Sequence, residues 1–250
     1  MSSSTQPHLR VLVVVPAWNE EDSVGSVVQE IRRVDPLIDV LVVDDGSGDR
    51  TSRAAEQAGA AVCRLPFNLG VGGAMRTGYR YALREGYDVV VQVDADGQHD
   101  ASYIPRLVEA LADADVVVGA RFAGEGAYAA RGPRRWAMRL LSSVLSRLAH
   151  QPLSDVTSGF RAVNRRGIRL FATHYPSEYL GDTVESLVIA VRTGCRVRQV
   201  PVSMRVRATG QASQSTARST LYLARALVAL GLALVRRWPT TLETVPQELT

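Results

Sequence analysis

The chain has 250 residues, 46% of them hydrophobic, and a formal net charge of +4 at pH 7. This composition is ordinary for a globular protein and allows one large domain, or one domain with a tail. The two cysteines, Cys63 and Cys195, exclude a disulfide framework and a cysteine-based metal cluster, and the first ten residues lack the apolar core of a signal peptide, so we expect none.

Apolar runs alternate with amphipathic segments along the first 120 residues. We expect strands at 9–15, 39–43, 61–65, 89–93 and 115–120, and helices at 24–31, 51–58, 70–84 and 103–112. Short connections between them predict repeated β-α-β units. The fold class is therefore α/β, with a mostly parallel sheet flanked by helices.

The fourth of these runs ends in two carboxylates, Asp94 and Asp96, with the amide of Gln98 close behind. A run of this kind is typical of a strand that is buried on both faces, and open α/β sheets bind ligands at the carboxyl ends of their strands. Hard oxygen donors suit Mg²⁺ or Mn²⁺, with further ligands from substrate phosphates. The alternative is an ordinary acidic turn that closes a strand.

Carboxylates also follow the first two expected strands, at Glu20 and Glu21 and at Asp44 and Asp45. The first strand is not followed by the G-x-G-x-x-G turn of dinucleotide-binding proteins. Acidic groups at one sheet edge suit the hydroxyls of a base and ribose, or a phosphate bound through a metal. The alternative is that they cap the following helices.

The second half of the chain is strongly basic. Residues 121–170 contain ten arginines and two acids, which indicates an anionic partner: a phosphate, a lipid headgroup or a nucleic acid. Residues 136–149 have helical periodicity with arginines interleaved, which fits either a solvated helix or a surface that meets lipid headgroups. A further helix is expected at 181–193 and a strand at 196–202.

Asp155 lies six residues before Arg161, on an expected turn into a strand. For a hydroxyl acceptor a carboxylate should take the proton, and Asp155 is the first candidate for this base, with Glu185 the second. A phosphate acceptor is already ionised and needs no base; Arg121 and Arg161 would then clamp it. The alternative for Asp155 is a turn or capping residue.

Residues 221–235 form the most apolar segment, but its longest uninterrupted run is ten residues, against about 20 for a membrane-spanning helix. We expect a helix in the membrane interface, or a core or dimerisation helix. The expected organisation is a disordered N-terminus at 1–8, a catalytic domain at 9–217, a C-terminal amphipathic helix at 218–238 and a disordered tail at 239–250. The polar stretch 210–216 could form a lid.

Four motifs together resemble glycosyltransferase family 2, in its dolichyl-phosphate mannosyltransferase and bacterial polyprenyl-phosphate branch. They are Pro16–Glu20, Val43–Ser47, Asp94–His99 and Thr157–Arg161. The resemblance implies a GT-A fold, a UDP- or GDP-linked sugar donor, a Mg²⁺ or Mn²⁺ ion and inversion at the anomeric carbon. It also implies a polyprenyl phosphate acceptor, a location at the cytoplasmic face of the membrane, and a small membrane partner or a homodimer, with no nucleic-acid partner.

The resemblance also implies site residues. The nucleotide-sugar would be bound by Pro16, Trp18, Glu20, Val43, Asp45, Asp94, Ala95, Arg121 and Arg207. The metal ligands would be Asp94, Asp96 and Gln98, and the residues acting in transfer Asp96, Asp155, Arg121 and Arg161. The family has a lysine where this chain has Ser213, so loop closure would pass to Arg205 or Arg218. The alternatives are a soluble or glycan hydroxyl acceptor with Asp155 as base, and a nucleotide-sugar-binding subunit without turnover.

Overall fold

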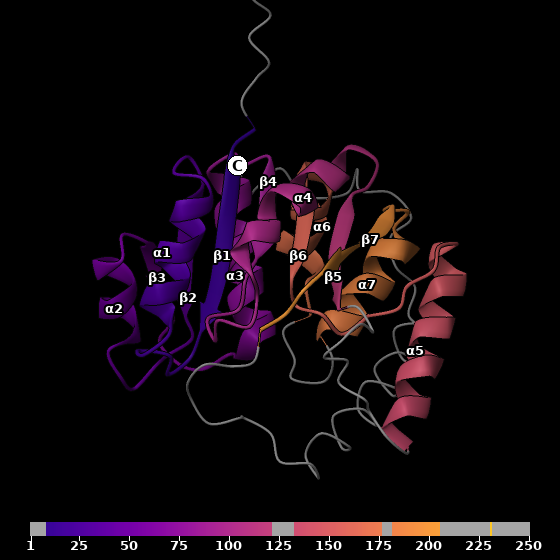
Figure 1. Ribbon diagram of the computed structural model, residues 1–250, viewed down its shortest axis with the longest axis horizontal. Coiled ribbons are helices and arrows are strands. Elements are labelled where there is room, and N and C mark those ends of the chain that lie inside the picture. The colour runs from indigo at the N-terminus through magenta and orange to yellow at the C-terminus, as the bar shows by residue number, and fades with distance from the viewer. Residues whose placement is uncertain (1–8, 122–132, 177–181, 206–230, 232–250) are drawn as a thin grey trace, which may run out of the picture.

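The protein is described here by a computed structural model, which covers residues 9–121, 133–176, 182–205 and 231; the side chains of 133–138 are not included. Within these residues one seven-stranded sheet has the order β3-β2-β1-β4-β6-β5-β7 (Figure 1). The strands are β1 (Val11–Ala17), β2 (Asp39–Asp44), β3 (Ala61–Arg64), β4 (Val89–Gln92), β5 (Val116–Arg121), β6 (Arg161–Asn164) and β7 (Val197–Val202).

Helices cover both faces of this sheet. They are α1 (Val24–Val34), α2 (Thr51–Gln57), α3 (Gly70–Arg84), α4 (Ile104–Glu109), α5 (Pro133–Ala149), α6 (Arg165–His174) and α7 (Asp182–Arg192), with short 3-10 turns at Ala101–Tyr103 and Ala110–Ala112. Buried side chains of α1, α2 and α4 share one hydrophobic cluster, and those of α3, α5, α6 and α7 share the other. The fold is therefore a sheet between two helical layers, as its β-α-β pattern predicts.

Alternation along the strands explains why both faces are apolar. Val13 and Val15 of β1 belong to the cluster under α1, whereas Leu12 and Val14 belong to the cluster under α3. Successive side chains of a strand point to opposite faces, so a strand covered on both sides must be apolar throughout. The same helical spacing that predicts α1 buries Val24, Val27, Val28 and Ile31.

The expected mostly parallel sheet is confirmed, with one exception in its middle. Strand β6 lies between β4 and β5 and is antiparallel to both. The structure also adds α6, which the sequence pattern did not predict, and it extends β1 through Pro16 and Ala17, which were expected in a loop. Pro16 is accommodated in the strand although it has no N–H to donate.

The predicted helix at 136–149 is present as part of α5, which Figure 1 shows at the outer end of the sheet beyond β7. Its buried residues Leu141 and Leu145 face the core, while Arg139, Leu140 and Arg147 are exposed. No helix in the described part of the chain combines the length and the apolar character needed to cross a membrane. The expected N-terminus, the C-terminal helix apart from residue 231, the tail and residues 210–216 lie outside the described residues.

Candidate functional site at the carboxyl edge of the sheet

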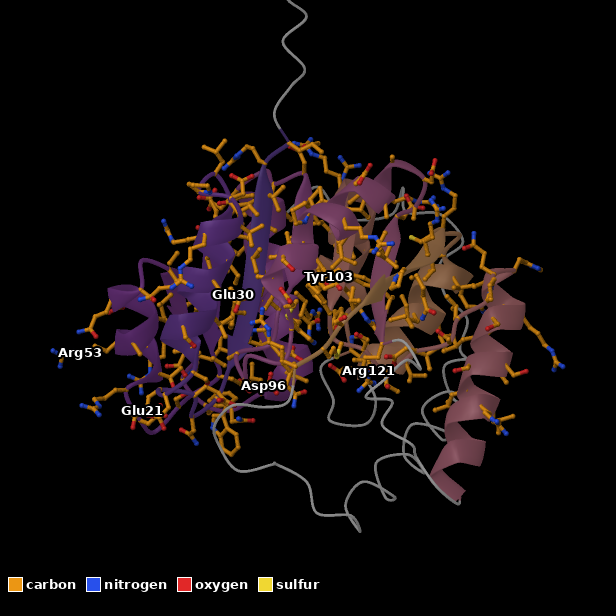
Figure 2. The ribbon with its side chains drawn as sticks, viewed as in Figure 1. Glu21, Glu30, Arg53, Asp96, Tyr103 and Arg121 are labelled. Carbon is orange, nitrogen blue, oxygen red and sulfur yellow. The ribbon has the colours of Figure 1, made fainter. Side chains whose placement is uncertain are left out.

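The carboxyl ends of β1, β2 and β4 meet at one edge of the sheet, because the three strands are parallel neighbours. Figure 2 shows Glu21, Asp96 and Arg121 along this edge, with Glu30 farther up the molecule. Trp18 follows β1 and is 52% exposed, whereas Val43 is completely buried in β2. Trp18 can therefore contact a ligand through its side chain, whereas Val43 could do so only through its backbone.

The loop after β1 is fixed by the loop after β2. Asn19 has a positive φ of 53°; its backbone N–H donates to Ser47 Oγ at 3.0 Å, and its side-chain oxygen accepts from the Gly48 N–H at 2.9 Å. The Glu20 N–H donates to Thr51 Oγ1 at 2.9 Å, and Ser23 Oγ donates to the Glu20 carboxylate at 2.7 Å. The bonds to Ser47, Gly48 and Thr51 hold the loop after β1 against the chain that follows β2.

Asp45 is buried, and both of its carboxylate oxygens accept backbone hydrogen bonds at the start of α3. The Leu69 and Gly70 N–H groups donate to them at 2.7 and 2.8 Å. Burial raises the pKa of Asp45, with neighbouring Asp44 adding to the rise and the two backbone bonds opposing it. Asp45 thus caps α3, whereas the capping alternative drawn from the sequence concerned the helix that directly follows each strand, here α2.

Asp94 stands where β4 ends, and Ala95 and Asp96 form a turn directly after it. The Asp94 side chain is 38% exposed, and its Oδ1 accepts from Gln92 Nε2 at 3.1 Å. The Gln98 N–H donates to Asp96 Oδ1 at 3.0 Å, which closes the turn. The two carboxylates expected to hold a cation therefore flank the buried Ala95 at the strand end.

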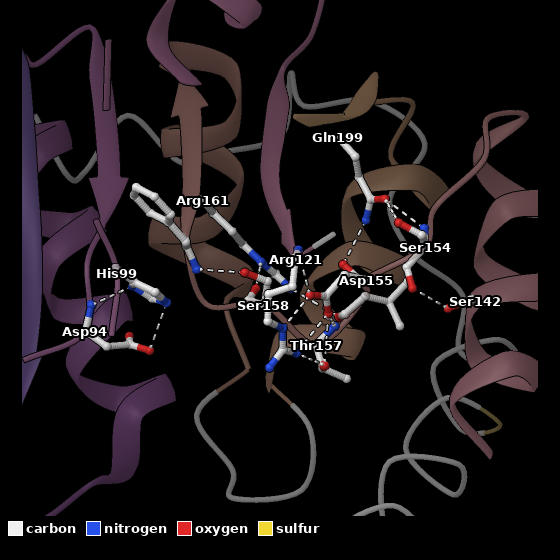
Figure 3. A network of polar contacts seen from close by, with 12 residues as sticks. Asp94, His99, Arg121, Ser142, Ser154, Asp155, Thr157, Ser158, Arg161 and Gln199 are labelled. Carbon is white, nitrogen blue, oxygen red and sulfur yellow. Dashed lines mark hydrogen bonds and ion pairs between the residues drawn. The ribbon is translucent and has the colours of Figure 1, made fainter. Parts of the chain in front are cut away.

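His99, to which the sequence pattern gave no role, orients Asp94. The Asp94 backbone N–H donates to His99 Nδ1 at 3.0 Å, and His99 Nε2 lies 3.6 Å from Asp94 Oδ2 (Figure 3). The buried imidazole stacks on Phe160, with ring centroids 4.8 Å apart. The contact between His99 and Phe160 could not be predicted from the sequence, because the two residues are 61 positions apart and meet only through the pairing of the antiparallel strand β6.

Gly159 brings the fourth motif against the third. A Cβ atom at this position would lie 3.1 Å from Asp94 Oδ2 and 3.0 Å from Gln92 Nε2. A side chain of any size would press on the carboxylate, so glycine is needed here for close approach. The Thr157–Arg161 motif therefore forms one wall of the Asp94 site.

Arg121 and Asp155 form a forked ion pair at the end of β5 (Figure 3). Arg121 Nε and Nη2 donate to the two carboxylate oxygens at 2.7 and 3.1 Å, and Nη2 also donates to Thr157 Oγ1 at 3.1 Å. Burial of Asp155 alone would raise its pKa, but the bonds and charge of Arg121 outweigh burial, so the pKa of Asp155 is lowered. The Arg121 side chain remains 48% exposed.

Arg161, expected as a second clamp on the acceptor, is only 1% exposed. Its guanidinium donates to the carbonyls of Ser158 and Thr183, both at 2.8 Å, and to Ser186 Oγ at 2.7 Å. The expectation of direct phosphate contact is not supported by this placement. Arg161 instead joins the Thr157–Arg161 motif to the start of α7.

Asp182, at the start of α7, is a buried carboxyl group that no sequence pattern pointed to. Burial raises its pKa to about 6, with Asp94 adding to the rise and Arg161 opposing it. Glu185, the second candidate base, lies half-buried on the same helix. Arg207 and Ser213 lie outside the described residues.

The residues at the β4 end fit a hard divalent ion whose coordination is completed by a substrate. Among the described residues no three His, Cys, Asp or Glu side chains are grouped so that they could hold a metal by themselves. Asp94 and Asp96 supply two carboxylates, and Gln92 Oε1 is buried without a hydrogen-bond partner in the described structure. Mg²⁺ sites of this kind take one or two carboxylates and the remaining ligands from phosphates and water.

Comparisons with known proteins place this edge in a family. An undecaprenyl-phosphate mannosyltransferase of Micrococcus luteus is 36% identical over 83% of this chain and 88% of its own length. A polyprenol monophosphomannose synthase of Mycolicibacterium smegmatis is 30% identical over 85% of this chain and 84% of its own. The solved structure of glucosyl-3-phosphoglycerate synthase from Mycobacterium tuberculosis, with Mn²⁺, UDP and phosphoglyceric acid, has a TM-score of 0.71 at 20% identity, covering 92% of this chain and 80% of that one.

At 20% identity, the likeness to glucosyl-3-phosphoglycerate synthase concerns the fold alone, which is of the GT-A type. The sequence profile described as Glycosyl transferase family 2 matches residues 12–171, from the first residues of β1 to α6, and so covers the four motifs at the carboxyl edge of the sheet. The chain therefore belongs to glycosyltransferase family 2 and is a glycosyltransferase.

Proposed function

We propose that the protein transfers a sugar from a nucleotide-sugar donor to the phosphate of a polyprenyl phosphate. By their names, one of the two relatives transfers mannose to undecaprenyl phosphate and the other makes polyprenol monophosphomannose, and each is aligned over more than four fifths of its length. The donor would lie between the ends of β1, β2 and β4, where Trp18 is exposed and Asp94 and Asp96 flank the strand end.

The ion pair between Arg121 and Asp155 is the observation that favours a phosphate acceptor over a hydroxyl acceptor. A general base must have a free oxygen and a pKa suited to accepting a proton. Both Asp155 oxygens are bound to Arg121 and its pKa is lowered, so it is poorly suited to deprotonating a hydroxyl. A phosphate oxygen is already ionised, and it needs a cation to hold it rather than a base.

In the proposed reaction an acceptor phosphate oxygen attacks the anomeric carbon of the sugar. The bond from that carbon to the nucleoside diphosphate breaks, and its electron pair leaves with the diphosphate, which inverts the anomeric centre. Arg121 would hold the acceptor oxygen, while Arg161 and Gly159 shape the wall between the acceptor and Asp94. A divalent ion held by Asp94, Asp96 and the Gln98 amide would neutralise the charge that develops on the leaving diphosphate.

The test compares two acceptors that differ in one group. The protein is incubated with Mn²⁺ and a panel of UDP- and GDP-linked sugars, with either a short polyprenyl phosphate or the matching polyprenol. We expect a glycosyl phosphate lipid by mass spectrometry from the phosphate alone. Transfer to the polyprenol, or no lipid product from any donor, would contradict the proposed acceptor.

We further propose peripheral attachment at the cytoplasmic face of a membrane. The outer side of α5 carries Arg139, Leu140 and Arg147, a mixture suited to anionic headgroups. Flotation with vesicles that contain or lack anionic lipid tests this directly. Binding that depends on anionic lipid and weakens when Arg139 and Arg147 are replaced by glutamine supports it, and unchanged binding contradicts it.

A further inference from the structure

The chain that leaves β7 crosses to the loop that follows β4. Figure 1 shows this segment running from the β7 end of the sheet across toward β1 and β4. Met204 forms an isolated antiparallel bridge with His99, and the Arg205 N–H donates to the Gln98 carbonyl at 2.9 Å. Tyr103 Oη also donates to Ser203 Oγ at 3.2 Å. Residues 203–205 therefore lie directly on the acidic loop, which we define as residues 94–100.

The side chain of Arg205 joins this contact to a third element. Its Nη1 donates to Glu30 Oε2 of α1 at 2.7 Å, and its Nη2 lies 3.1 Å from Asp100 Oδ1. Glu30 accepts through its other oxygen from the Ala101 N–H at 3.1 Å. One guanidinium thus bridges two carboxylates, one on a helix and one on the acidic loop, a geometry that a planar fork of donors provides and a single ammonium does not.

This arrangement excludes one role for Arg205. It was expected from the sequence as a substitute for the family lysine at Ser213, closing over the diphosphate. Its guanidinium is instead bound by Glu30 and Asp100, whereas the Asp94 carboxylate accepts from Gln92 and has His99 Nε2 at 3.6 Å. The pKa of Arg205 is raised, first by its bond to Glu30, so it stays charged in this position.

The contacts lead from Arg205 to the cation site in two steps. The Arg205 side chain binds Asp100 at the end of the acidic loop, while the backbone of residues 204 and 205 pairs with His99 and Gln98. His99 Nδ1 in turn accepts from the Asp94 backbone N–H, and its Nε2 lies 3.6 Å from Asp94 Oδ2. We propose that Arg205 is a positioning residue, which holds the acidic loop in the shape that binds the divalent ion and the diphosphate. It touches neither of them. Groups that orient metal ligands from outside typically change metal affinity about 10- to 100-fold when they are removed.

An exposed ion pair ordinarily contributes little to global stability, and Arg205 is 47% exposed. This separates the proposal from a merely structural role. A structural role predicts small effects on everything, whereas a positioning role predicts a large effect on cation affinity with little change in melting temperature. Arg198 is the matched control, because it lies on β7 and forms a comparable exposed pair with Asp113 at 3.0 Å, but does not contact the acidic loop.

The experiment measures Mn²⁺ affinity by calorimetry in the presence of UDP or GDP, and amide exchange at residues 96–100 without metal. We expect Arg205→Ala to weaken Mn²⁺ binding about tenfold and to accelerate exchange in the loop, with Glu30→Gln giving the same changes at smaller size. Arg205→Lys should restore binding only in part. Arg198→Ala should leave both readouts as in the wild type.

The proposal is overturned if Arg205→Ala and Arg198→Ala give the same Mn²⁺ affinity and the same exchange rates. If Arg205→Ala fails to fold, Glu30→Gln takes its place in the same two measurements, and wild-type values in both overturn the proposal. The inference rests on the proposed metal-dependent function, but its failure is distinguishable. A wild-type protein that binds no Mn²⁺ with either nucleotide contradicts the function, whereas unchanged loop exchange in the variants contradicts the role of Arg205.

Discussion

Arg121 and Asp155 neutralise each other at the end of β5, with Arg121 Nε 2.7 Å from Asp155 Oδ2. A second pair at the other end of the same strand has nearly the same exposure: Arg166 and Asp115, at 3.4 Å. The two pairs offer the same kind of interaction at opposite edges of the sheet. They therefore allow an effect on the reaction to be separated from an effect on the fold.

Arg121→Ala should lower kcat/KM for polyprenyl phosphate about 100-fold, because it removes the cation that we propose holds the attacking oxygen. The buried Asp155 carboxylate would keep its hydrogen bonds from the residue 121 backbone N–H and from Thr157 but lose its charged partner, which should cost about 1–3 kcal/mol of stability. Arg166→Ala should cost a similar stability but leave kcat/KM near the wild-type value. Steady-state kinetics with varied acceptor and urea unfolding measure the two quantities, and equal kinetic losses in both variants would contradict the assignment.

Asp155→Asn distinguishes the two acceptor classes. The amide still accepts a hydrogen bond from Arg121 but cannot serve as a base, so transfer to a phosphate acceptor should persist at about a tenth of the wild-type rate or more. Donor affinity, measured by calorimetry with UDP and GDP, should be unchanged. Loss of all transfer with intact donor binding would restore Asp155 as the base for a hydroxyl acceptor.

Asp94→Asn and Asp96→Asn should each weaken Mn²⁺ binding in the presence of nucleotide at least tenfold, because a neutral amide is a poorer ligand for a hard cation than a carboxylate. The control is Asp88→Asn, at the amino end of the same strand. Asp88 accepts from the Arg10 N–H at 2.9 Å and pairs with Arg165, so its loss should affect stability and leave cation binding unchanged. Calorimetry that finds wild-type affinity in both strand-end variants would remove the basis for a metal at this site.

Much of the fold and of the site could be predicted from local patterns. The apolar runs at Val11–Val15 and Val89–Val91 predict strands because burial on both faces requires an unbroken apolar sequence. The position of Asp94 and Asp96 follows from the predicted strand, since residues that come directly after a strand lie at the carboxyl edge of the sheet. A strand was expected after the turn at Asp155, but the antiparallel direction of β6 could not be predicted in this way, because the strand has four residues with polar ends and its direction depends on a distant pairing.

The roles of single polar residues were harder to predict than their positions. The expected place of Asp45 beside the base and ribose stays a prediction, but the bonds of its two oxygens to the start of α3 were not predicted, because they depend on the chain after β3 returning to the end of β2. Arg161 was expected to clamp an acceptor phosphate, yet its side chain is buried. Its guanidinium donates to the Thr183 carbonyl, 22 positions away, and to the nearby Ser158 carbonyl. A sequence pattern does not reveal contacts of this kind.

Gly159→Ala tests whether the fourth motif shapes the cation site. Its new Cβ would lie 3.1 Å from Asp94 Oδ2, so the carboxylate must move by a few tenths of an ångström. We expect Mn²⁺ affinity to fall severalfold, on the order of the effects seen when supporting contacts of a metal ligand are disturbed. Gly25→Ala in α1 is the control, since its Cβ would meet its nearest neighbour, the Ala54 carbonyl of α2, at 3.6 Å and should leave affinity unchanged. Equal affinities in the two variants would show that the approach of Gly159 to Asp94 has no functional weight.

Asp182 and Asp155 should give stability profiles of opposite sign against pH, measured with EDTA so that no cation contributes. The pKa of Asp182 is raised to about 6, so the folded state binds its proton more tightly than the unfolded state does. Stability should therefore fall as pH rises from about 4 to about 6 and stay level above, by roughly 2–3 kcal/mol in total. Asp182→Asn should remove this fall, which makes the variant more stable than the wild type at pH 8 and nearly equal to it at pH 4.

The pKa of Asp155 is lowered, so its contribution to stability is present at neutral pH and disappears as pH falls below about 4, through the folded-state pKa. Asp155→Asn should therefore be less stable than the wild type at pH 8, and this difference should vanish in acid. Thermal unfolding of both variants across pH 3–8 compares the two carboxylates in one experiment. If Asp182→Asn destabilises at pH 8 as Asp155→Asn does, then Asp182 is ionised and paired with Arg161 in the folded protein, and the burial argument for its raised pKa is wrong.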